Sequence, residues 1–432
     1  MNSPPQQENE EVLLAVHGVV MRVTAGKGIA ASAVFPALHA LPRGLDATNA
    51  WAITVSETIP GAAPSEPETV STMRIPPDAE VRCWRDECGV FCASLEGGTV
   101  RIDPKPKQAV LQVDPGSRDQ DLVGGLATVE ILRYEGLFPV HAGAVEVAGS
   151  AVLVCGGPGQ GKSTLTAAWA CLGNARFMAQ DRCVVFRRDG LTWIGGIADE
   201  LALLPDTVGL LQDLGIRLPT PLGRARGKLS YNCHDFFLSL RDDPAPVRTI
   251  LFLVPGTAER SLIRPCEAAE KFALLQEASF YTGAPDVMKA HFEALADLAN
   301  NVPAYAIASR PDCIAVIREL DCLLAKQPAP VCHPLPPSSQ HAVRIPPDRA
   351  ARAEEALRAI IADPEAVEIP ARNDMQSWRE ILRSADRNGL LPVLARSLER
   401  TGVLAQLHNP VANVLRLALR NTQIGVKPQV TG

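Results

Sequence analysis

A short glycine-rich segment constrains this chain more than any other part of its sequence. Residues 156–164 read Gly-Gly-Pro-Gly-Gln-Gly-Lys-Ser-Thr and fit the pattern G-x-x-x-x-G-K-[ST] at every fixed position. The run Ala151–Cys155 before it is short and apolar, as in a buried strand, and Ser163–Leu172 after it has helical character. A strand, a glycine loop and a helix in this order predict an α/β fold whose strands are buried on both faces.

The residue types in this segment suit the binding of a phosphate chain. Glycines let backbone N–H groups turn inward around an anion without a side-chain clash, and the following helix adds its positive N-terminus. Lys162 can reach the β- and γ-phosphates, and the Ser163 hydroxyl can bind Mg²⁺. We therefore expect a nucleoside triphosphate with Mg²⁺, held by Gly156, Gly157, Pro158, Gly159, Gln160, Gly161, Lys162, Ser163 and Thr164. ATPases, GTPases and kinases share this pattern, so it does not select a reaction.

Composition limits the partners of the chain. The net charge is −6 and the pI is about 5.8, which disfavours nucleic acid or a membrane surface as the main partner, since both favour basic patches. No apolar run reaches transmembrane length, and the polar N-terminus lacks a secretory signal, so we expect a cytoplasmic protein. Cys83, Cys88 and Cys92 have no neighbouring His and wide spacing, which favours a strand pair with cysteines as filler over a zinc site.

The 432 residues suit two or three domains. Residues 1–135 carry short alternating runs between Pro, Gly and Asp turns and predict a β-rich N-terminal domain, with strands at Val12–Val16, Val19–Val23, Val81–Cys92 and Val110–Val113. Residues 136–326 alternate strand and helix patterns around the glycine loop and form the expected catalytic domain. Residues 327–347 are a proline-rich linker, and residues 348–432 have the apolar spacing of a small helical module.

Polar residues that flank the loop are candidates for catalysis. Asp181 precedes a predicted strand at Val184–Phe186 and can bind Mg²⁺ or take a proton from an acceptor hydroxyl, although a turn carboxylate is the structural alternative. His141 lies on the strand expected before the loop strand. A single histidine on a strand usually has a structural role, which is the alternative to a catalytic one. Glu200 is a second candidate metal ligand, in competition with Asp199 and Asp206.

A basic cluster lies further along the chain. Arg224, Arg226 and Lys228 belong to a glycine-containing loop that can supply positive charge to a γ-phosphate or to an acidic peptide. Charge clusters of this kind are also found as solvated loops. Lys228 is the member that we take as a candidate catalytic residue.

The flanks carry a resemblance to a known family. The segments Phe138-Pro-Val-His-Ala-Gly-Ala-Val, the glycine loop and Gln180-Asp181-Arg182 resemble the HPr kinase/phosphorylase superfamily over roughly residues 138–325. The likeness is strongest to HPr-kinase-related kinases encoded beside lasso-peptide biosynthesis genes. Further shared features are Ala198–Asp206, the Lys of Gly227-Lys228-Leu, and a late helix Phe292–Asn301. Gln180 stands where the family has the first Asp of a pair, the phosphorylase signature is not recognisable, and the N-terminal region does not match.

The resemblance implies an ATP- and Mg²⁺-dependent kinase. The acceptor would be a serine of a peptide or protein, such as the C-terminal serine of a lasso precursor peptide, with Asp181 or His141 accepting the hydroxyl proton. Self-association into a homo-oligomer is also compatible with the family. Two alternatives remain open: a nucleotide-binding regulatory protein in which Gln180 has weakened catalysis, and a small-molecule kinase on the same core. Residues from Trp378 onward resemble the opening helices of an uncharacterised nucleotidyltransferase family, without its paired Asp motif.

Overall fold

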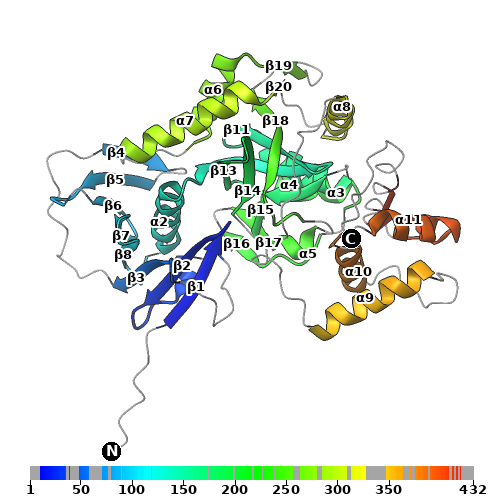
Figure 1. The fold of residues 1–432 in the computed structure, drawn as a ribbon, viewed down its shortest axis with the longest axis horizontal. Helices are drawn as coiled ribbons and strands as arrows, with labels where there is room; N and C mark the ends of the chain where they lie inside the picture. The colour runs from blue at the N-terminus through cyan, green and yellow to red at the C-terminus, as the bar shows by residue number, and fades with distance from the viewer. Residues whose placement is uncertain are drawn as a thin grey trace, which may run out of the picture. The chain divides into compact units, whose positions relative to one another are not determined.

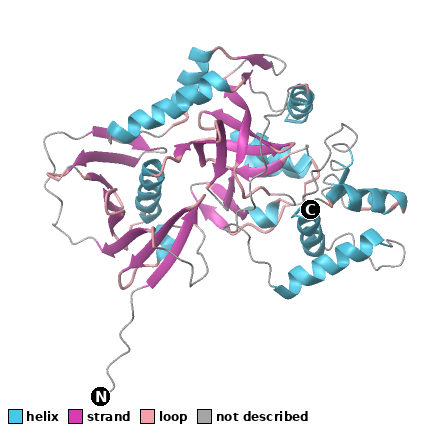
Figure 2. Cartoon of the chain, viewed as in Figure 1, coloured by secondary structure: helices cyan, strands magenta, loops and turns pink. Residues whose placement is uncertain are grey.

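The fold is taken from a computed structural model of the chain. It describes residues 10–35, 38, 48–57, 71–75, 79–88, 90–117, 119–172, 175–197, 200–216, 218–225, 227–237, 240–255, 263–279, 285–308, 313–326, 347–362, 370, 375–387, 390–407, 411–412, 415–416 and 419. The chain has an α/β fold with several sheets, coloured by secondary structure in Figure 2. It divides into two units, each built from separate stretches of sequence.

The first unit contains an eight-stranded sheet in the order β1-β2-β3-β8-β7-β6-β5-β4. Two neighbouring pairs, β2 with β3 and β3 with β8, are parallel, and the remaining pairs are antiparallel. Alternating burial along β3 and β8 places one face of the sheet in the core. The strands, labelled in Figure 1, are β1 Glu10–Val16, β2 Val19–Ala25, β3 Trp51–Glu57, β4 Ser71–Ile75, β5 Ala79–Arg85, β6 Phe91–Leu95, β7 Gly98–Asp103 and β8 Gln108–Val113.

Helix α2 (Gln120–Tyr134) contacts β7 and β8 of this sheet, and the short α1 (Ala31–Val34) packs on α2. Their approach is close, because a Cβ on Gly124 would lie 1.9 Å from the carbonyl oxygen of Val34. The unit is completed by an antiparallel set of strands and by two helices, α6 and α7, that contact each other. These elements are β9 Phe138–Val140, β13 Cys183–Arg188, β14 Leu191–Gly196, α6 Ala268–Glu277 and α7 Pro285–Asn301.

The second unit contains the glycine loop and a sheet whose central strands are parallel. Strand β11 (Ser150–Gly156) pairs in parallel with β18 (Ala245–Val254), which pairs in parallel with β20 (Ala304–Ala308). Strands β10 (Gly143–Val147), β12 (Arg176–Ala179) and β19 (Ile263–Pro265) extend this sheet through antiparallel pairs. Residues 150–155 of β11 and 245–253 of β18 are all buried, as expected for strands covered on both faces.

Helices pack on this sheet, and the chain between β14 and β18 forms a second, three-stranded sheet. Helix α3 (Lys162–Leu172) contacts α8 (Cys313–Ala325), and the indole N–H of Trp169 donates to Asp321 at 3.0 Å. The small sheet has the order β15-β17-β16. Its strands and the nearby helices are β15 Glu200–Leu203, α4 Pro205–Asp213, β16 Gly223–Ala225, β17 Lys228–Asn232 and α5 Cys233–Phe236.

Helices near the C-terminus bury an apolar cluster of their own. Its fully buried members include Trp378, Leu394 and Leu398, on amphipathic helices. The helices are α9 Pro347–Ala362, α10 Met375–Arg387 and α11 Leu391–Arg400, followed by a 3₁₀ turn at Val403–Ala405. No helix among the described residues combines the length and the apolar character needed to cross a membrane.

The sequence patterns located most long elements and misjudged some short ones. The run Val81–Cys92 forms the expected strand pair, as the antiparallel strands β5 and β6, on which Cys83 and Cys92 are buried, whereas Cys88 is exposed between the strands. His141, expected on a strand, lies between β9 and β10 instead. The basic loop around Lys228 is a β-hairpin made by β16 and β17, with Gly227 at φ +79° in its turn. The predicted linker 327–347 lies outside the described residues except for Pro347.

Candidate functional site

The glycine loop leaves β11 and enters α3 at Lys162. Gly159 and Gly161 have φ of +75° and +90°, a region that residues with a Cβ rarely adopt. Gly156 is required for a different reason, since a Cβ there would lie 3.0 Å from the carbonyl oxygen of Leu253 on the neighbouring strand. The N–H of Gly157 donates to the Gln160 side chain at 2.6 Å. The loop therefore needs its glycines for backbone geometry and for the close approach of β18.

Lys162 lies within the loop. Its side chain is buried, and Nζ donates to the carbonyl oxygens of Gly156 at 2.8 Å and Gly157 at 3.2 Å. Burial lowers the pKa of Lys162, an effect that Asp181 and Cys155 oppose and Lys228 reinforces. Asp181 and Lys228 therefore both act on the Lys162 ammonium electrostatically.

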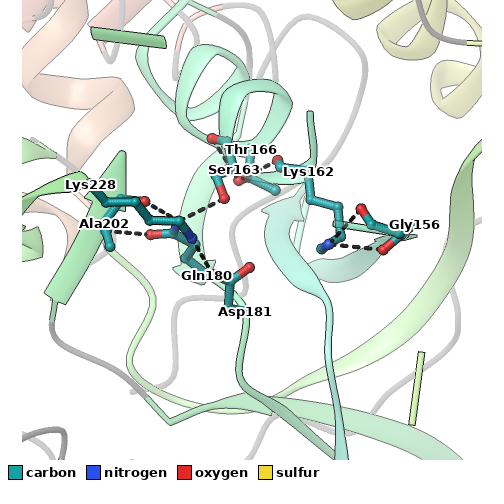
Figure 3. Close-up of polar contacts among 9 residues, drawn as sticks. Gly156, Lys162, Ser163, Thr166, Gln180, Asp181, Ala202 and Lys228 are labelled. Carbon is teal, nitrogen blue, oxygen red and sulfur yellow. Dashed lines mark hydrogen bonds and ion pairs between the residues drawn. The ribbon is translucent and has the colours of Figure 1, made fainter. Parts of the chain in front are cut away.

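Ser163 is tied to a residue far along the chain. Gln180 is 4% exposed, and its Nε2 donates to Ser163 Oγ at 2.7 Å (Figure 3). The same carboxamide accepts from the backbone N–H of Ala202 and donates to the carbonyl oxygen of Ala202, both at 2.7 Å. The hydroxyl at the start of α3 is thus linked through Gln180 to strand β15.

Asp181 and Lys228 face each other next to this network. Nζ of Lys228 is 3.5 Å from Oδ2 of Asp181, and the side chains are 38% and 28% exposed. Asp181 has φ +61°, a left-handed conformation that is uncommon for a residue with a side chain. Such strain clusters at functional sites, because surrounding structure must hold it in place. The structure therefore brings together two residues that the sequence analysis proposed separately.

Other candidates have different partners. The Thr164 hydroxyl lies 2.8 Å from the Thr207 hydroxyl on α4. Glu200 is exposed at the start of β15 and accepts a hydrogen bond from Ser230 at 2.8 Å. Asp206 lies in the first turn of α4 and is exposed, and Asp199 is outside the described residues. The hydrogen bond from Ser230 therefore fixes the Glu200 carboxylate on the three-stranded sheet.

His141 and the arginines are the remaining candidates. His141 directly follows Val140, which pairs with Cys183 in the register of β9 with β13, and its backbone N–H donates to the carbonyl oxygen of Ala278 at 2.6 Å. Arg224 is exposed on β16. Arg226 lies outside the described residues. In the second unit, Ser163 is thus bonded to Gln180, Asp181 pairs with Lys228, and both members of that pair act electrostatically on Lys162.

The sequence did not reveal the hydrogen bonds that join Ser163, Gln180 and Ala202. Gln180 was noted only as the replacement of an acid, and Ala202 has no polar side chain to attract attention. The contact depends on β15 lying beside the residues that follow β12, and no local pattern indicates that pairing. Thr207, the partner of Thr164, was missed for the same reason.

Comparisons with known proteins add little to this geometry. No protein-family model matches the chain, and no curated protein matches it. Among solved structures that match is the Hpr(Ser) kinase/phosphatase from Coxiella burnetii, which is 14% identical. The match covers 44% of this chain and 91% of that chain, with a TM-score of 0.26. A likeness this weak establishes neither a fold family nor an activity.

Proposed function

We propose that the chain is an ATP- and Mg²⁺-dependent kinase that transfers the γ-phosphate to a serine hydroxyl of a peptide or protein. The observation that carries the proposal is the grouping of Lys162, Asp181 and Lys228 at a strand–glycine loop–helix segment. The loop offers backbone N–H groups to phosphates, two ammonium groups offset negative charge, and a carboxylate can take a proton. Phosphoryl transfer needs these groups together.

In the proposed reaction the acceptor oxygen forms a bond to the γ-phosphorus while the bond from that phosphorus to the bridging oxygen of ADP breaks. The hydroxyl proton passes to a carboxylate oxygen of Asp181. Lys162 stabilises the charge that develops on the phosphoryl oxygens. In the proposal, Lys228, which faces Asp181 at 3.5 Å, stabilises the same phosphoryl charge after a change of side-chain rotamer. His141 remains a predicted alternative proton acceptor.

The residues present fit Mg²⁺. This ion is held in proteins by one or two side-chain oxygens together with substrate phosphates and water, and the hydroxyl of Ser163 and carboxylate of Asp181 are hard oxygen donors of that kind. Glu200 is the further candidate ligand, and its contact with Ser230 would have to be given up or shared. When bound, Mg²⁺ would neutralise phosphate charge and orient the triphosphate.

The acceptor follows from the resemblance described above. We take the C-terminal serine of a lasso precursor peptide as the first candidate. The regulatory alternative receives support from one observation, the exchange of a family acid for Gln180, because an amide cannot replace a carboxylate as a base or a charged ligand. The two proposals differ in whether bound ATP is consumed.

The test is mass spectrometry of candidate precursor peptides after incubation with ATP·Mg²⁺ and the full chain. The expected product is a peptide heavier by a phosphoryl group on serine, formed with wild type and lost with Asp181→Asn. Binding of ATP by calorimetry without transfer to any peptide, or to a panel of small hydroxyl compounds, would favour the regulatory alternative. Transfer to small compounds alone would contradict a peptide substrate.

A further inference from the structure

Gln180 is held in one orientation by its neighbours. The backbone N–H of Ala202 can only donate a hydrogen bond, so the carboxamide oxygen must face it, and this contact is 2.7 Å long. The amide nitrogen is thereby turned toward the carbonyl oxygen of Ala202 and toward Ser163 Oγ, each at 2.7 Å. Both amide hydrogens and the amide oxygen are used, in a side chain that is almost fully buried.

This orientation decides the role of the Ser163 hydroxyl. Since Gln180 donates to Oγ, Ser163 accepts with one lone pair and keeps a second lone pair and its own hydrogen for other partners. A neighbouring carboxylate would do the opposite, because it can only accept and would draw the hydroxyl hydrogen toward itself. The hydroxyl thus has a defined rotamer before any ligand arrives.

We propose that Gln180 is a positioning residue that holds Ser163 Oγ ready as a Mg²⁺ ligand and couples it to the strand pair that carries Lys228. The inference rests on the proposed function and deepens it. Ala202 lies opposite Ser230 in the pairing of β15 with β17, and Lys228 begins β17. Gln180 therefore joins the start of α3 to the strands that present the second cation (Figure 3). In this proposal, Gln180 replaces the acid of the family without loss of function, because it orients the Ser163 hydroxyl.

Groups that orient a metal ligand typically change metal affinity by about 10- to 100-fold when they are removed. The test is Gln180→Glu, which keeps the shape of the side chain but sets an acceptor against the carbonyl of Ala202 and reverses the Ser163 hydrogen bond. We expect the Mg²⁺ concentration for half-maximal ATP binding, measured by calorimetry, to rise at least about tenfold. ATP binding in the presence of a chelator should change far less. Gln212→Glu adds the same charge at an exposed position of α4 and should leave the Mg²⁺ requirement unchanged.

A double-mutant cycle separates positioning from a general structural effect. Gln180→Met, which is neutral and similar in length, should raise the Mg²⁺ requirement in the wild-type background and add little to Ser163→Ala, because its effect passes through the hydroxyl. If Gln180→Glu does not fold, Gln180→Met serves as the test variant in its place. Thermal melting without nucleotide reports the separate loss of the contacts to Ala202.

The outcomes distinguish this inference from the proposed function. If wild type binds ATP with Mg²⁺ and both Gln180 variants keep its Mg²⁺ requirement, or if the Met effect is additive with Ser163→Ala, Gln180 does not position the hydroxyl. If wild type binds no nucleotide, the proposed function and this inference fail together. A raised Mg²⁺ requirement that disappears in the Ser163→Ala background supports the inference.

Discussion

The two halves of the candidate site are built differently. Ser163 belongs to a network around the buried side chain of Gln180, whose three contacts are all 2.7 Å long. Asp181 and Lys228 are about one third exposed, and the nearest approach of their charged atoms is 3.5 Å. The first half is rigid because each polar atom of Gln180 has a partner in a low-dielectric environment, where hydrogen bonds are strong. The second half is a partly exposed ion pair, whose members exchange partners at little cost.

This difference suggests a division of labour. Atoms that position phosphates and a metal gain from being fixed in advance, since no reorganisation is then needed during the reaction. Atoms that accept a proton or follow the transferring group must change their interactions as charge moves. We expect substitutions in the first half to act on nucleotide and Mg²⁺ binding, and substitutions in the second to act on the rate of transfer.

The largest effect is expected for Lys162→Ala. Lys162 offsets charge that develops in the transition state, and loss of one such donor typically lowers kcat by about 100- to 1000-fold. Steady-state kinetics with a phosphorylated peptide as product measures this change, and the melting temperature should show that the fold survives. A variant that kept more than about a tenth of wild-type turnover would count against the assignment of the loop.

Asp181→Asn should lower kcat by about 100-fold while ATP binding is retained. The amide has nearly the same shape as the carboxylate, so packing survives, but it can neither take the proton nor supply the negative charge. Calorimetry with ATP and single-turnover kinetics separate these two properties. Full activity of Asp181→Asn would transfer the role to another group, with Glu200 and His141 as the next candidates to substitute.

Lys228→Met should lower kcat by roughly tenfold, a smaller loss because Lys162 still serves the phosphates. The melting temperature should hardly change, since partly exposed ion pairs contribute about 0–1 kcal/mol to the free energy of unfolding. Arg224→Met is the matched control, because Arg224 is an exposed cation on the paired strand of the same hairpin. Equal losses for both variants would mean that the hairpin acts through its overall charge.

The smallest effect is expected for a chain that ends at Pro346. Helices α9, α10 and α11 bury their own apolar cluster, so their removal should leave a folded core that ATP·Mg²⁺ stabilises. The measurement is the rise in melting temperature on adding ATP·Mg²⁺. A core that became insoluble, or lost that rise, would show that the helices belong to the nucleotide-binding domain and that the proposed boundary is wrong.

Removal of residues 1–135 provides the contrast to that truncation. The apolar core of the first unit joins strands of the eight-stranded sheet to Leu137, Val184, Ile197 and Val287, all of which lie outside residues 1–135. Deleting the sheet would expose these side chains, and we expect aggregation, measured by light scattering. A soluble, monodisperse product would make the sheet an independent appendage.

Local patterns were sufficient for the long elements and for the loop. The apolar run before Gly156 predicted a strand, which is β11, and the residues after the glycine loop predicted a helix, which is α3. Apolar spacing likewise predicted a helical module from residue 348 onward, where α9, α10 and α11 lie. These features are local because helix periodicity and glycine geometry act over a few neighbouring residues. The short strands β3 and β15 were missed, since their pairing depends on distant partners, and β7 was missed although it pairs with its sequence neighbours β6 and β8.

Residue types and their spacing were enough to predict that a glycine loop joins a buried strand to a helix, with Lys162, Ser163 and Asp181 following in order. The partners of these side chains, in contrast, are set by the folded chain. Gln180 looked like the loss of an acid, and the fold turns it into a buried bridge between Ser163 and Ala202. Lys228 looked like one charge in a loop, and the hairpin brings it to Asp181. Contacts between residues far apart in sequence are set by sheet register, which short sequence patterns do not encode.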